Sequence, residues 1–362
     1  MADTILTARA MKQLRSTIIR AGLGALYFTG AHHVLRPLLA GTGAVFMLHH
    51  VRPARDDDFQ PNHHLEITPD FLRATLEHVR ALGVDIVSMD EMVRRMTARD
   101  FSRRFACFTF DDGYRDNRDH ALPVMREFDA PFTVYVTSEF ASGHGKLWWV
   151  TLERLIAAND SLDVEIGGTV EHIDTRDAEA KQAAFGKLHD WLRGLANDKE
   201  IHLALASLCN RYGIDTTSAC RDLCMTWDEL KSFAADPLVT IGAHTVSHCQ
   251  LAKDVDAKAR EEIDASRTAI VAKLGRAVNH FAYPYGDRSA AGAREFAITR
   301  ALGFKSAVTT RPGMLFAENA EHLTALPRIS LNGNFQDERF LSVLTSGAAT
   351  AMWNGFRRVD AA

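Results

Sequence analysis

Two short segments of the sequence carry the residue types that bind a catalytic metal. In the segment TFDDG, two adjacent carboxylates, Asp111 and Asp112, end an apolar run. In the segment HTVSH, two imidazoles, His244 and His248, stand four positions apart. Carboxylate oxygen and neutral imidazole are the usual non-sulfur ligands of catalytic Zn²⁺, and three protein ligands leave a fourth position for water. Asp112, His244 and His248 supply three such ligands, and Asp111 is left beside them to take a proton from the water.

Each motif by itself has an ordinary structural explanation. Paired aspartates before a glycine often form a solvated turn, and histidines four positions apart often lie exposed on a helix. Here, however, both motifs follow apolar runs typical of strands, as does a third segment, FAYPYG, which contains Pro284 and Tyr285. In β/α barrels the carboxyl ends of the strands carry the active site. The sequence therefore predicts a metal site assembled from separate strand ends.

The elements that position these motifs alternate regularly along the chain. Short apolar runs and amphipathic helical patterns follow one another from about residue 44 to 330, which favours a parallel sheet or a barrel. Helical patterns at 69–82 and 257–274 are each followed by a glycine that is typical of a helix end. We expect strands at residues 44–48, 84–89, 105–110, 132–137, 238–243, 280–283, 304–310 and 325–330.

This alternation is interrupted between about residues 143 and 224, which we interpret as an inserted, mainly helical segment. It contains the pair Trp148 and Trp149, a short strand-like run near 164–166 and a long helical pattern over 175–211. We accordingly predict three parts. They are a helical N-terminal extension at 1–40, a catalytic domain at 41–335 that includes the insertion, and a helical C-terminal tail at 336–362.

Together, the three motifs resemble those of the polysaccharide deacetylase family, carbohydrate esterase family four, whose shared region is called the NodB homology domain. TFDDG matches the first motif, HTVSH the second and FAYPYG the third, and the resemblance covers roughly residues 41–335. It implies an α/β fold, a distorted (β/α) barrel, and one divalent metal, with Zn²⁺ the expected ion. It also implies hydrolysis of N-acetyl groups on polysaccharides or oligosaccharides that contain N-acetylhexosamine.

The resemblance also implies roles for individual residues. By position, Asp111 would be the general base, and Asp112, His244 and His248 would be the metal ligands. The backbone N–H of Tyr285 would donate to the developing oxyanion, and such a donor is typically worth about 3–4 kcal/mol. The C–N bond breaks only if the departing amine is protonated, so the reaction also needs an acid.

The acid and the orienting arginine depart from the commoner family pattern. Many members have a Leu-x-His near the end of the domain, whereas the corresponding stretch here is LPRI. A subset supplies the histidine from the first strand, and FMLHHV resembles that subset, so we predict His49 as the acid with His50 as the alternative. The common third motif begins with an arginine, which is Phe281 in this sequence. We hypothesise that Arg328 replaces it beside the base.

Further residues are expected to lie around the cleft as substrate-binding or supporting side chains. Tyr114 and Arg115 follow the aspartates and should border the cleft, with Arg115 supporting rather than catalytic. Pro284 precedes Tyr285 in the third motif. Trp148 and Trp149 could stack on sugar rings or anchor the insertion to the core, and both interpretations stay open.

Composition and charge limit the classes of partner. The chain has a net charge of −4, which gives no broad basic face and argues against nucleic acid. An odd number of cysteines in irregular positions indicates reduced thiols and favours a cytoplasmic protein; they are Cys107, Cys209, Cys220, Cys224 and Cys249.

The N-terminus combines basic residues with a short apolar stretch. Arg9, Lys12, Arg15 and Arg20 precede the apolar residues 21–28, which are too few to span a bilayer. We interpret this segment as an amphipathic helical extension that touches a membrane surface or a partner. The expected location is therefore cytoplasmic, with membrane association open.

Three functions compete for these features. The first is a metal-dependent N-deacetylase acting on a glycan. The second is an amidohydrolase acting on a non-sugar C–N bond, and the third is a glycan-binding protein whose catalytic site has decayed. An intact base beside the metal ligands favours an enzyme, because a binding protein needs no such group. The absence of a Gly-x-Ser-x-Gly segment argues against a serine hydrolase.

Overall fold

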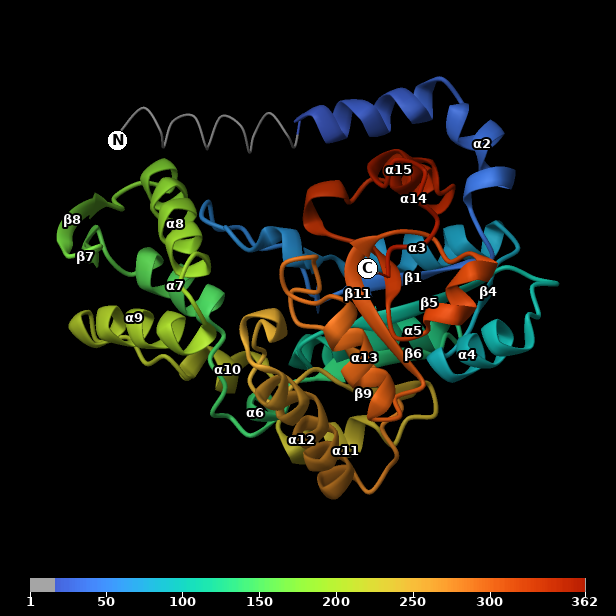
Figure 1. Cartoon of the computed structure of the whole chain (residues 1–362). Helices are drawn as coiled ribbons and strands as arrows, with labels where there is room; N and C mark the ends of the chain where they lie inside the picture. The colour runs from blue at the N-terminus through green and yellow to red at the C-terminus, as the bar shows by residue number, and fades with distance from the viewer. Residues whose placement is uncertain (1–16, 362) are drawn as a thin grey trace.

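The computed structural model describes residues 17–361, and its centre is a closed barrel of seven parallel strands (Figure 1). The strands follow the order β1-β12-β11-β10-β9-β6-β5, and β5 closes the barrel by pairing with β1. This architecture confirms the predicted distorted (β/α) barrel. The barrel strands are β1 (Gly43–Leu48), β5 (Phe105–Phe110), β6 (Phe132–Val136), β9 (Val239–Ala243), β10 (His280–Ala282), β11 (Ser306–Pro312) and β12 (Leu326–Ser330).

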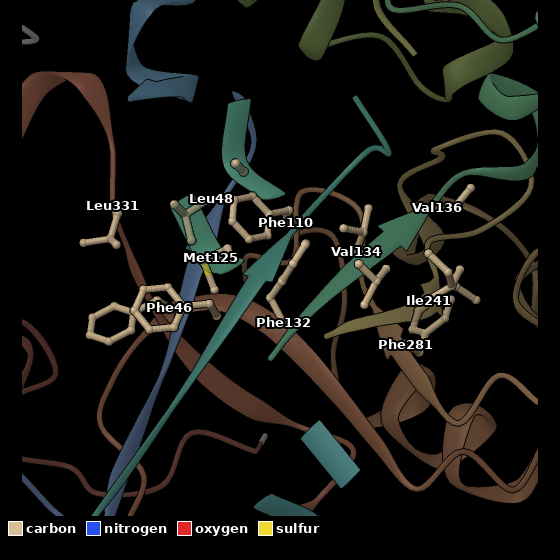
Figure 2. Packing of buried hydrophobic residues seen from close by; sticks show 14 of the residues in the cluster. Phe46, Leu48, Phe110, Met125, Phe132, Val134, Val136, Ile241, Phe281 and Leu331 are labelled. Carbon is tan, nitrogen blue, oxygen red and sulfur yellow. The ribbon is translucent and has the colours of Figure 1, made fainter. Parts of the chain in front are cut away.

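The barrel strands are buried on both faces because helices cover the outside and side chains fill the inside. Every residue of β1, β5 and β6 is buried, as expected for parallel strands with continuous apolar runs. Aromatic rings join neighbouring strands in this core (Figure 2). The ring centroid of Phe110 lies 5.3 Å from that of Phe132, and the Phe46 ring lies 5.0 Å from that of Phe108.

The predicted strand at 84–89 is much shorter in the structure. β4 comprises only Asp85–Ile86, pairs with the start of β5 and lies outside the closed barrel. Met89 belongs instead to helix α4 (Met89–Ala98), because the Ser88 side chain accepts a hydrogen bond from the Glu91 N–H (3.2 Å) and caps that helix. A second short parallel pair, β2 (His50–Val51) with β3 (Glu66–Ile67), continues beyond β1.

The helices between the strands pack on the outside of the barrel and begin at defined caps. The predicted helices at 69–82 and 257–274 are confirmed as α3 (Pro69–Ala81) and α12 (Asp256–Leu274). Thr68 caps α3 by accepting from the Phe71 N–H (3.2 Å), and Gly275 ends α12 with a left-handed φ of 67°. The remaining barrel helices are α5 (Leu122–Glu127), α6 (Ser138–Ala141), α11 (Trp227–Phe233) and α13 (Ala293–Ala301).

The segment between β6 and β9 contains a subdomain with a hydrophobic cluster of its own. The long helical pattern over 175–211 forms two helices rather than one. The chain turns after Gly194, and the Asn197 side chain accepts from the Glu200 N–H (3.0 Å) to start the second helix. The elements are α7 (Trp148–Ala157), the hairpin β7 (Ser161–Ile166) with β8 (Thr169–Asp174), α8 (Ala178–Arg193), α9 (Asp198–Arg211) and α10 (Ser218–Leu223).

Helices from the two ends of the chain pack together on one side of the barrel (Figure 1). Residues 17–28 are helical and are followed by α2 (Ala31–Leu39), which contacts α15 (Ala348–Trp353); α14 (Glu338–Thr345) contacts α3. The proposed division at residues 40 and 335 stays a prediction, and residues 1–16 of the extension lie outside the described residues. Among residues 17–361, no helix combines the length and apolarity needed to cross a bilayer.

Candidate active site

Two consecutive carboxylates, Asp111 and Asp112, follow strand β5 and contact different partners. The Asp111 N–H still donates to the Leu48 carbonyl of β1 (2.9 Å), as a strand residue does. Asp112 then takes a left-handed φ of 74° and Gly113 one of 72°. That region is rare for residues with a Cβ and is typical of functional sites whose surroundings hold the strain. As a result, Asp111 contacts Arg328, whereas Asp112 contacts the two histidines.

The segment that carries His244 and His248 is not helical, although four positions correspond to about one helical turn. The segment after β9 is a loop in which Thr245 and His248 have φ values of 61° and 62°. Buried Glu262 of α12 holds this loop, because one of its oxygens accepts from the N–H groups of Val246 and Ser247 (both 3.0 Å). The loop therefore depends on a distant carboxylate that no local sequence pattern could reveal.

Asp112, His244 and His248 form a buried set of ligand atoms that all lie within 4.8 Å of one another. Asp112 Oδ1 lies 3.6 Å from His244 Nε2 and 3.3 Å from His248 Nε2, and it accepts no hydrogen bond from any residue in 17–361. The Nδ1–H of His244 donates to the Ala282 carbonyl (2.7 Å), which leaves the Nε2 lone pair directed toward Asp112. Burial lowers the pKa of His244 to about 4, so the imidazole is neutral. This donor set fits a divalent metal such as Zn²⁺.

Asp111 is held by the guanidinium of Arg328 from β12. Arg328 donates to both carboxylate oxygens of Asp111 (2.8 and 2.6 Å), and neither side chain is more than 2% exposed. Burial would raise the pKa of Asp111, but the Arg328 charge outweighs it and holds that pKa below its usual range. Arg328 is itself fixed by the Thr309 carbonyl (2.8 Å) and by Thr109 Oγ1 (3.2 Å). Phe281, at the position of the usual arginine, is buried in the barrel core.

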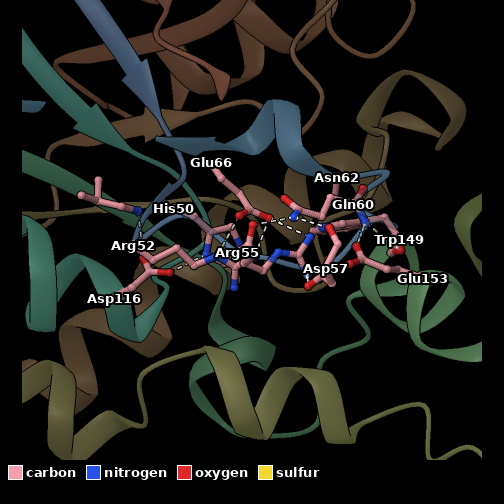
Figure 3. Close-up of polar contacts among 11 residues, drawn as sticks. His50, Arg52, Arg55, Asp57, Gln60, Asn62, Glu66, Asp116, Trp149 and Glu153 are labelled. Atoms are coloured by element: carbon pink, nitrogen blue, oxygen red, sulfur yellow. Dashed lines mark hydrogen bonds and ion pairs between the residues drawn. The ribbon is translucent and has the colours of Figure 1, made fainter. Parts of the chain in front are cut away.

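The two adjacent histidines after β1 face different partners. His49 Nε2 lies 3.9 Å from Asp111 Oδ2, and the side chain is 19% exposed. Burial lowers the pKa of His49 more than the two aspartates raise it. His50 instead donates from Nδ1 to Asp116 (2.6 Å) (Figure 3). The Asn117 amide donates to the His49 carbonyl (2.7 Å) and thereby fixes the backbone between the two rings.

The third motif places the ring of Tyr285 beside His248. Tyr285 has a left-handed φ of 59°, and its ring centroid lies 5.0 Å from that of His248. Its carbonyl accepts from the Thr310 hydroxyl (2.5 Å), whereas its N–H has no acceptor within the described part of the chain. Pro284 is buried immediately before it. The unused N–H is the kind of donor that an oxyanion requires.

Aromatic side chains of α6 and of the insertion contact His248 and Tyr285. Trp148 and Trp149 are 2% and 7% exposed, and Trp148 Nε1 donates to the Tyr285 hydroxyl (2.8 Å). Trp149 and Phe140 pack on the His248 ring, with centroids 5.0 and 5.7 Å away. This burial favours the interpretation of the tryptophans as anchors between insertion and barrel over stacking on a sugar ring.

Tyr114 and Arg115 do not line an open cleft. Tyr114 is fully buried and stacks on His50 at a centroid distance of 3.6 Å. Burial and the nearby Asp112 charge raise the pKa of its hydroxyl well above the usual value. Arg115 turns to Glu229 of α11, to which its Nε donates (2.8 Å). Both residues therefore contact other protein side chains and hold the segment that follows the DDG turn in place.

Comparisons with known proteins agree with this geometry. The family model described as polysaccharide deacetylase matches residues 98–307. The fold is similar to that of the Streptococcus pyogenes deacetylase PplD, solved in complex with acetate, with a TM-score of 0.55 and 18% identity over 83% of this chain and 97% of that chain. It is also similar to BC0361, a polysaccharide deacetylase from Bacillus cereus, with a TM-score of 0.51 and 16% identity over 83% of this chain and 68% of that one. A third similar structure is IcaB from Ammonifex degensii, with a TM-score of 0.50 and 16% identity over 84% and 96% of the two chains. No curated protein matches the sequence.

The segment that the family model matches contains most, but not all, of the residues of the candidate site. It contains both aspartates, both histidines of the candidate metal site and Tyr285, whereas His49, just after β1, and Arg328, on β12, lie outside it. Those two strands are neighbours in the barrel, with Phe46 opposite Ile329, so barrel closure brings their residues together. At identities below 20%, the solved structures show the shared fold alone, while the family model covers more than half of the sequence. The chain therefore belongs to the polysaccharide deacetylase family.

Proposed function

We propose that this protein is a metal-dependent N-deacetylase that removes acetyl groups from N-acetylhexosamine units of a glycan. The observation that carries the proposal is the buried Asp112 Oδ1, which faces two imidazole nitrogens at 3.3 and 3.6 Å and has no donor of its own. A buried carboxylate oxygen in such a position is strongly destabilising unless a cation neutralises it. A divalent cation held there would polarise the amide carbonyl and acidify a water molecule.

The surrounding side chains divide the proton transfers between them. Because Arg328 keeps Asp111 ionised, Asp111 is ready to accept a proton from the attacking water. The same pairing makes Asp111 a weak base, so its action depends on prior acidification of that water. The Tyr285 N–H donates to the carbonyl oxygen as negative charge develops on it.

His49 supplies the proton that the departing amine needs. It lies on the same side of the site as Asp111, at 3.9 Å, and it is more exposed than Asp111 or the metal ligands. Burial lowers its pKa, so a protonated His49 gives up its proton readily. His50 is excluded from this role by its hydrogen bond to Asp116.

Family membership supports a carbohydrate substrate, and the N-acetylhexosamine class is our inference from it. The buried tryptophans offer no open ring face, so they add no support for sugar over another amide. A non-sugar amidohydrolase is therefore the alternative that the experiment must separate. A decayed binding protein fits less well, because the Arg328, Asp111 and His49 set is assembled although two usual family residues are absent.

The test is acetate release from a panel of N-acetylated oligosaccharides by the Zn²⁺-loaded protein. We expect release that falls by about 10²–10⁴-fold in Asp111→Asn, because a base is lost while the ligands remain. Asp119→Asn, on an exposed aspartate paired with Arg118, is the matched control and should retain full activity. Release from simple amides but from no glycan would support the amidohydrolase, and no release from any amide by metal-loaded protein would overturn the proposed enzyme.

A further inference from the structure

The first two described helices expose several large apolar side chains to solvent. In the helix over 17–28, the exposed residues include Ile18, Ala21, Ala25 and Phe28, which recur at helical spacing on one side. An ordinary surface helix turns such a stripe toward the core and its polar side outward. Ile18 and Phe28 are 60% and 74% exposed, and the only charged residue in this helix is Arg20.

Helix α2 and the C-terminal residues carry further exposed apolar side chains. Val34 and Leu38, one turn apart on α2, are 77% and 68% exposed. Helix α15 contacts α2 and carries Met352, 57% exposed, and Phe356 just beyond it is 65% exposed. These helices lie along one side of the barrel (Figure 1). We refer to Ile18, Phe28, Val34, Leu38, Met352 and Phe356 as the N-terminal face.

The charge of the N-terminal region identifies the kind of surface that this face fits. After Asp3 the sequence contains no acidic residue until Asp56. Residues 1–40 carry five basic residues and one acidic residue, a net charge of +4, so the rest of the chain carries −8 to reach the total of −4. Two copies of so basic a segment would repel each other. An anionic partner would attract it.

We propose that the N-terminal face docks this protein onto the surface of an anionic lipid bilayer. Exposed Phe, Leu, Val and Met side chains on helices too short to span a membrane suit burial at the boundary of headgroups and acyl chains. Nearby arginines suit contact with anionic headgroups. Arg20 lies within the first helix, and the Arg339 guanidinium lies 5.9 Å from the Phe28 ring. An anionic bilayer would bury the exposed apolar side chains and also attract the basic residues.

Helix α2 lies at the opposite end of the barrel from the candidate active site. Helix α2 leads into the amino end of β1, whereas the site residues follow the carboxyl ends of the strands. The helix over 17–28 reaches the other end of the barrel, where Arg20 donates to the Asn334 carbonyl in the loop that follows β12. Substitutions at Val34 and Leu38 of α2 should therefore not alter hydrolysis of a soluble substrate, which separates this inference from the proposed function.

The experiment is cosedimentation of the full chain with two kinds of vesicle. We expect binding to phosphatidylcholine vesicles that contain about a third phosphatidylglycerol, little binding to phosphatidylcholine alone, and weaker binding at high salt. The double variant Val34→Asp/Leu38→Asp should lower the partition coefficient at least roughly tenfold, because it removes apolar burial and adds negative charge. Leu203→Asp, at a 61% exposed leucine of α9, is the matched control and should bind like the unaltered protein.

Thermal unfolding of both variants verifies that they fold, as expected for substitutions at exposed positions. Binding to neither kind of vesicle, or unaltered binding by the double variant, would overturn the proposal. Equal binding to neutral vesicles would overturn the assignment of an anionic surface. A dimer in light scattering that the double variant dissociates, without lipid binding, would show that a second copy covers the face instead.

Discussion

Two clusters of buried charged side chains lie beside each other beyond the carboxyl end of β1, and they differ in how their carboxylates are neutralised. The first cluster, which we call the loop network, connects β2 and β3 with α7 (Figure 3). Each of its carboxylates faces a cation or a donor of the protein itself. The pairs are Glu66 with Arg52 and Arg55, Glu153 with Arg55 and Asn62, and Asp116 with His50.

The second cluster is the candidate active site, and its pairing is incomplete. Asp111 is matched by Arg328, but Asp112 Oδ1 has only two imidazoles beside it. A buried carboxylate without a partner strongly destabilises the fold, whereas a paired one can have little net effect on stability. The loop network is therefore complete as folded, whereas under our proposal a bound cation would complete the site. The candidate active site thus differs from the loop network in having one buried carboxylate oxygen without a partner, and not in its number of charged residues.

Loss of a metal ligand should have the largest effect, because it removes the cation that completes the site. We expect His244→Ala to lose its bound metal and to lower kcat/KM for acetate release at least about a thousandfold, since the metal contributes several kcal/mol to the reaction. Elemental analysis and acetate release measure the two effects. His172→Ala, at an exposed histidine of β8, should change neither.

The same prediction can be tested on the unaltered protein. A chelator should abolish acetate release, and Zn²⁺ added to the metal-free protein should raise the Tm, because a ligand that binds the folded state stabilises it. Full turnover by metal-free protein, or by His244→Ala, would show that the site needs no cation. It would contradict the proposed difference between the site and the loop network.

Substitution of Arg328 should give the next largest effect, because it converts a matched carboxylate into an unmatched one. We expect Arg328→Met to lower the free energy of unfolding by about 3–5 kcal/mol. Arg328→Lys should restore only part of this, since an ammonium cannot replace two parallel hydrogen bonds. Urea unfolding of the metal-free protein at neutral pH is the measurement.

The pair of Arg126 with Asp236 provides the control for Arg328, because its arginine is exposed. The Arg126 side chain is 60% exposed, so Arg126→Met should cost no more than about 1 kcal/mol. Equal losses in the Arg126 and Arg328 variants would mean that burial of Asp111 has no energetic consequence.

His49 belongs to the candidate active site, whereas the adjacent His50 belongs to the loop network. We expect His49→Ala to lower kcat about a hundredfold on an N-acetylated substrate, because the departing amine needs a proton. The same variant should hydrolyse p-nitrophenyl acetate almost normally, since that leaving group departs without a proton. His50→Ala should reduce the free energy of unfolding by about 1–3 kcal/mol, because Asp116 loses its partner, and should leave kcat nearly unchanged. Reversed effects in the two variants would exchange their roles.

The sequence could predict the parts of the site that local pattern determines. The barrel strands follow from buried apolar runs, and the motif residues at their ends meet because parallel strands share one edge. The ligand set of Asp112, His244 and His248 follows from residue type and position, and the structure brings these three together. Arg328 was also inferred from sequence, as a substitute for the arginine missing at Phe281, and the structure places it on Asp111.

Features that depend on distant contacts could not be predicted. The loop that carries His248 takes its shape from Glu262, and the His49 backbone is held by Asn117. Neither residue stands at a recognisable spacing from the group it holds. The helix break after Gly194 was missed for a different reason, because helical periodicity continues on both sides of the break.

The loop network should give the smallest effect, and one that depends on pH. Burial would raise the pKa of Glu66, but the hydrogen bond and charge of Arg52 outweigh it and lower that pKa in the folded state. A lowered folded pKa stabilises the fold above the unfolded value of about 4.3, and this contribution is lost as the pH falls through the folded pKa. We therefore expect Glu66→Gln to cost about 2 kcal/mol at neutral pH and progressively less below about pH 4. Chemical unfolding across this range measures the difference, with Glu165→Gln on the exposed side of β7 as the control. A cost that is the same at every pH would mean that Glu66 contributes through shape rather than charge, and the loop network would then no longer be a matched set of ions to compare with the site.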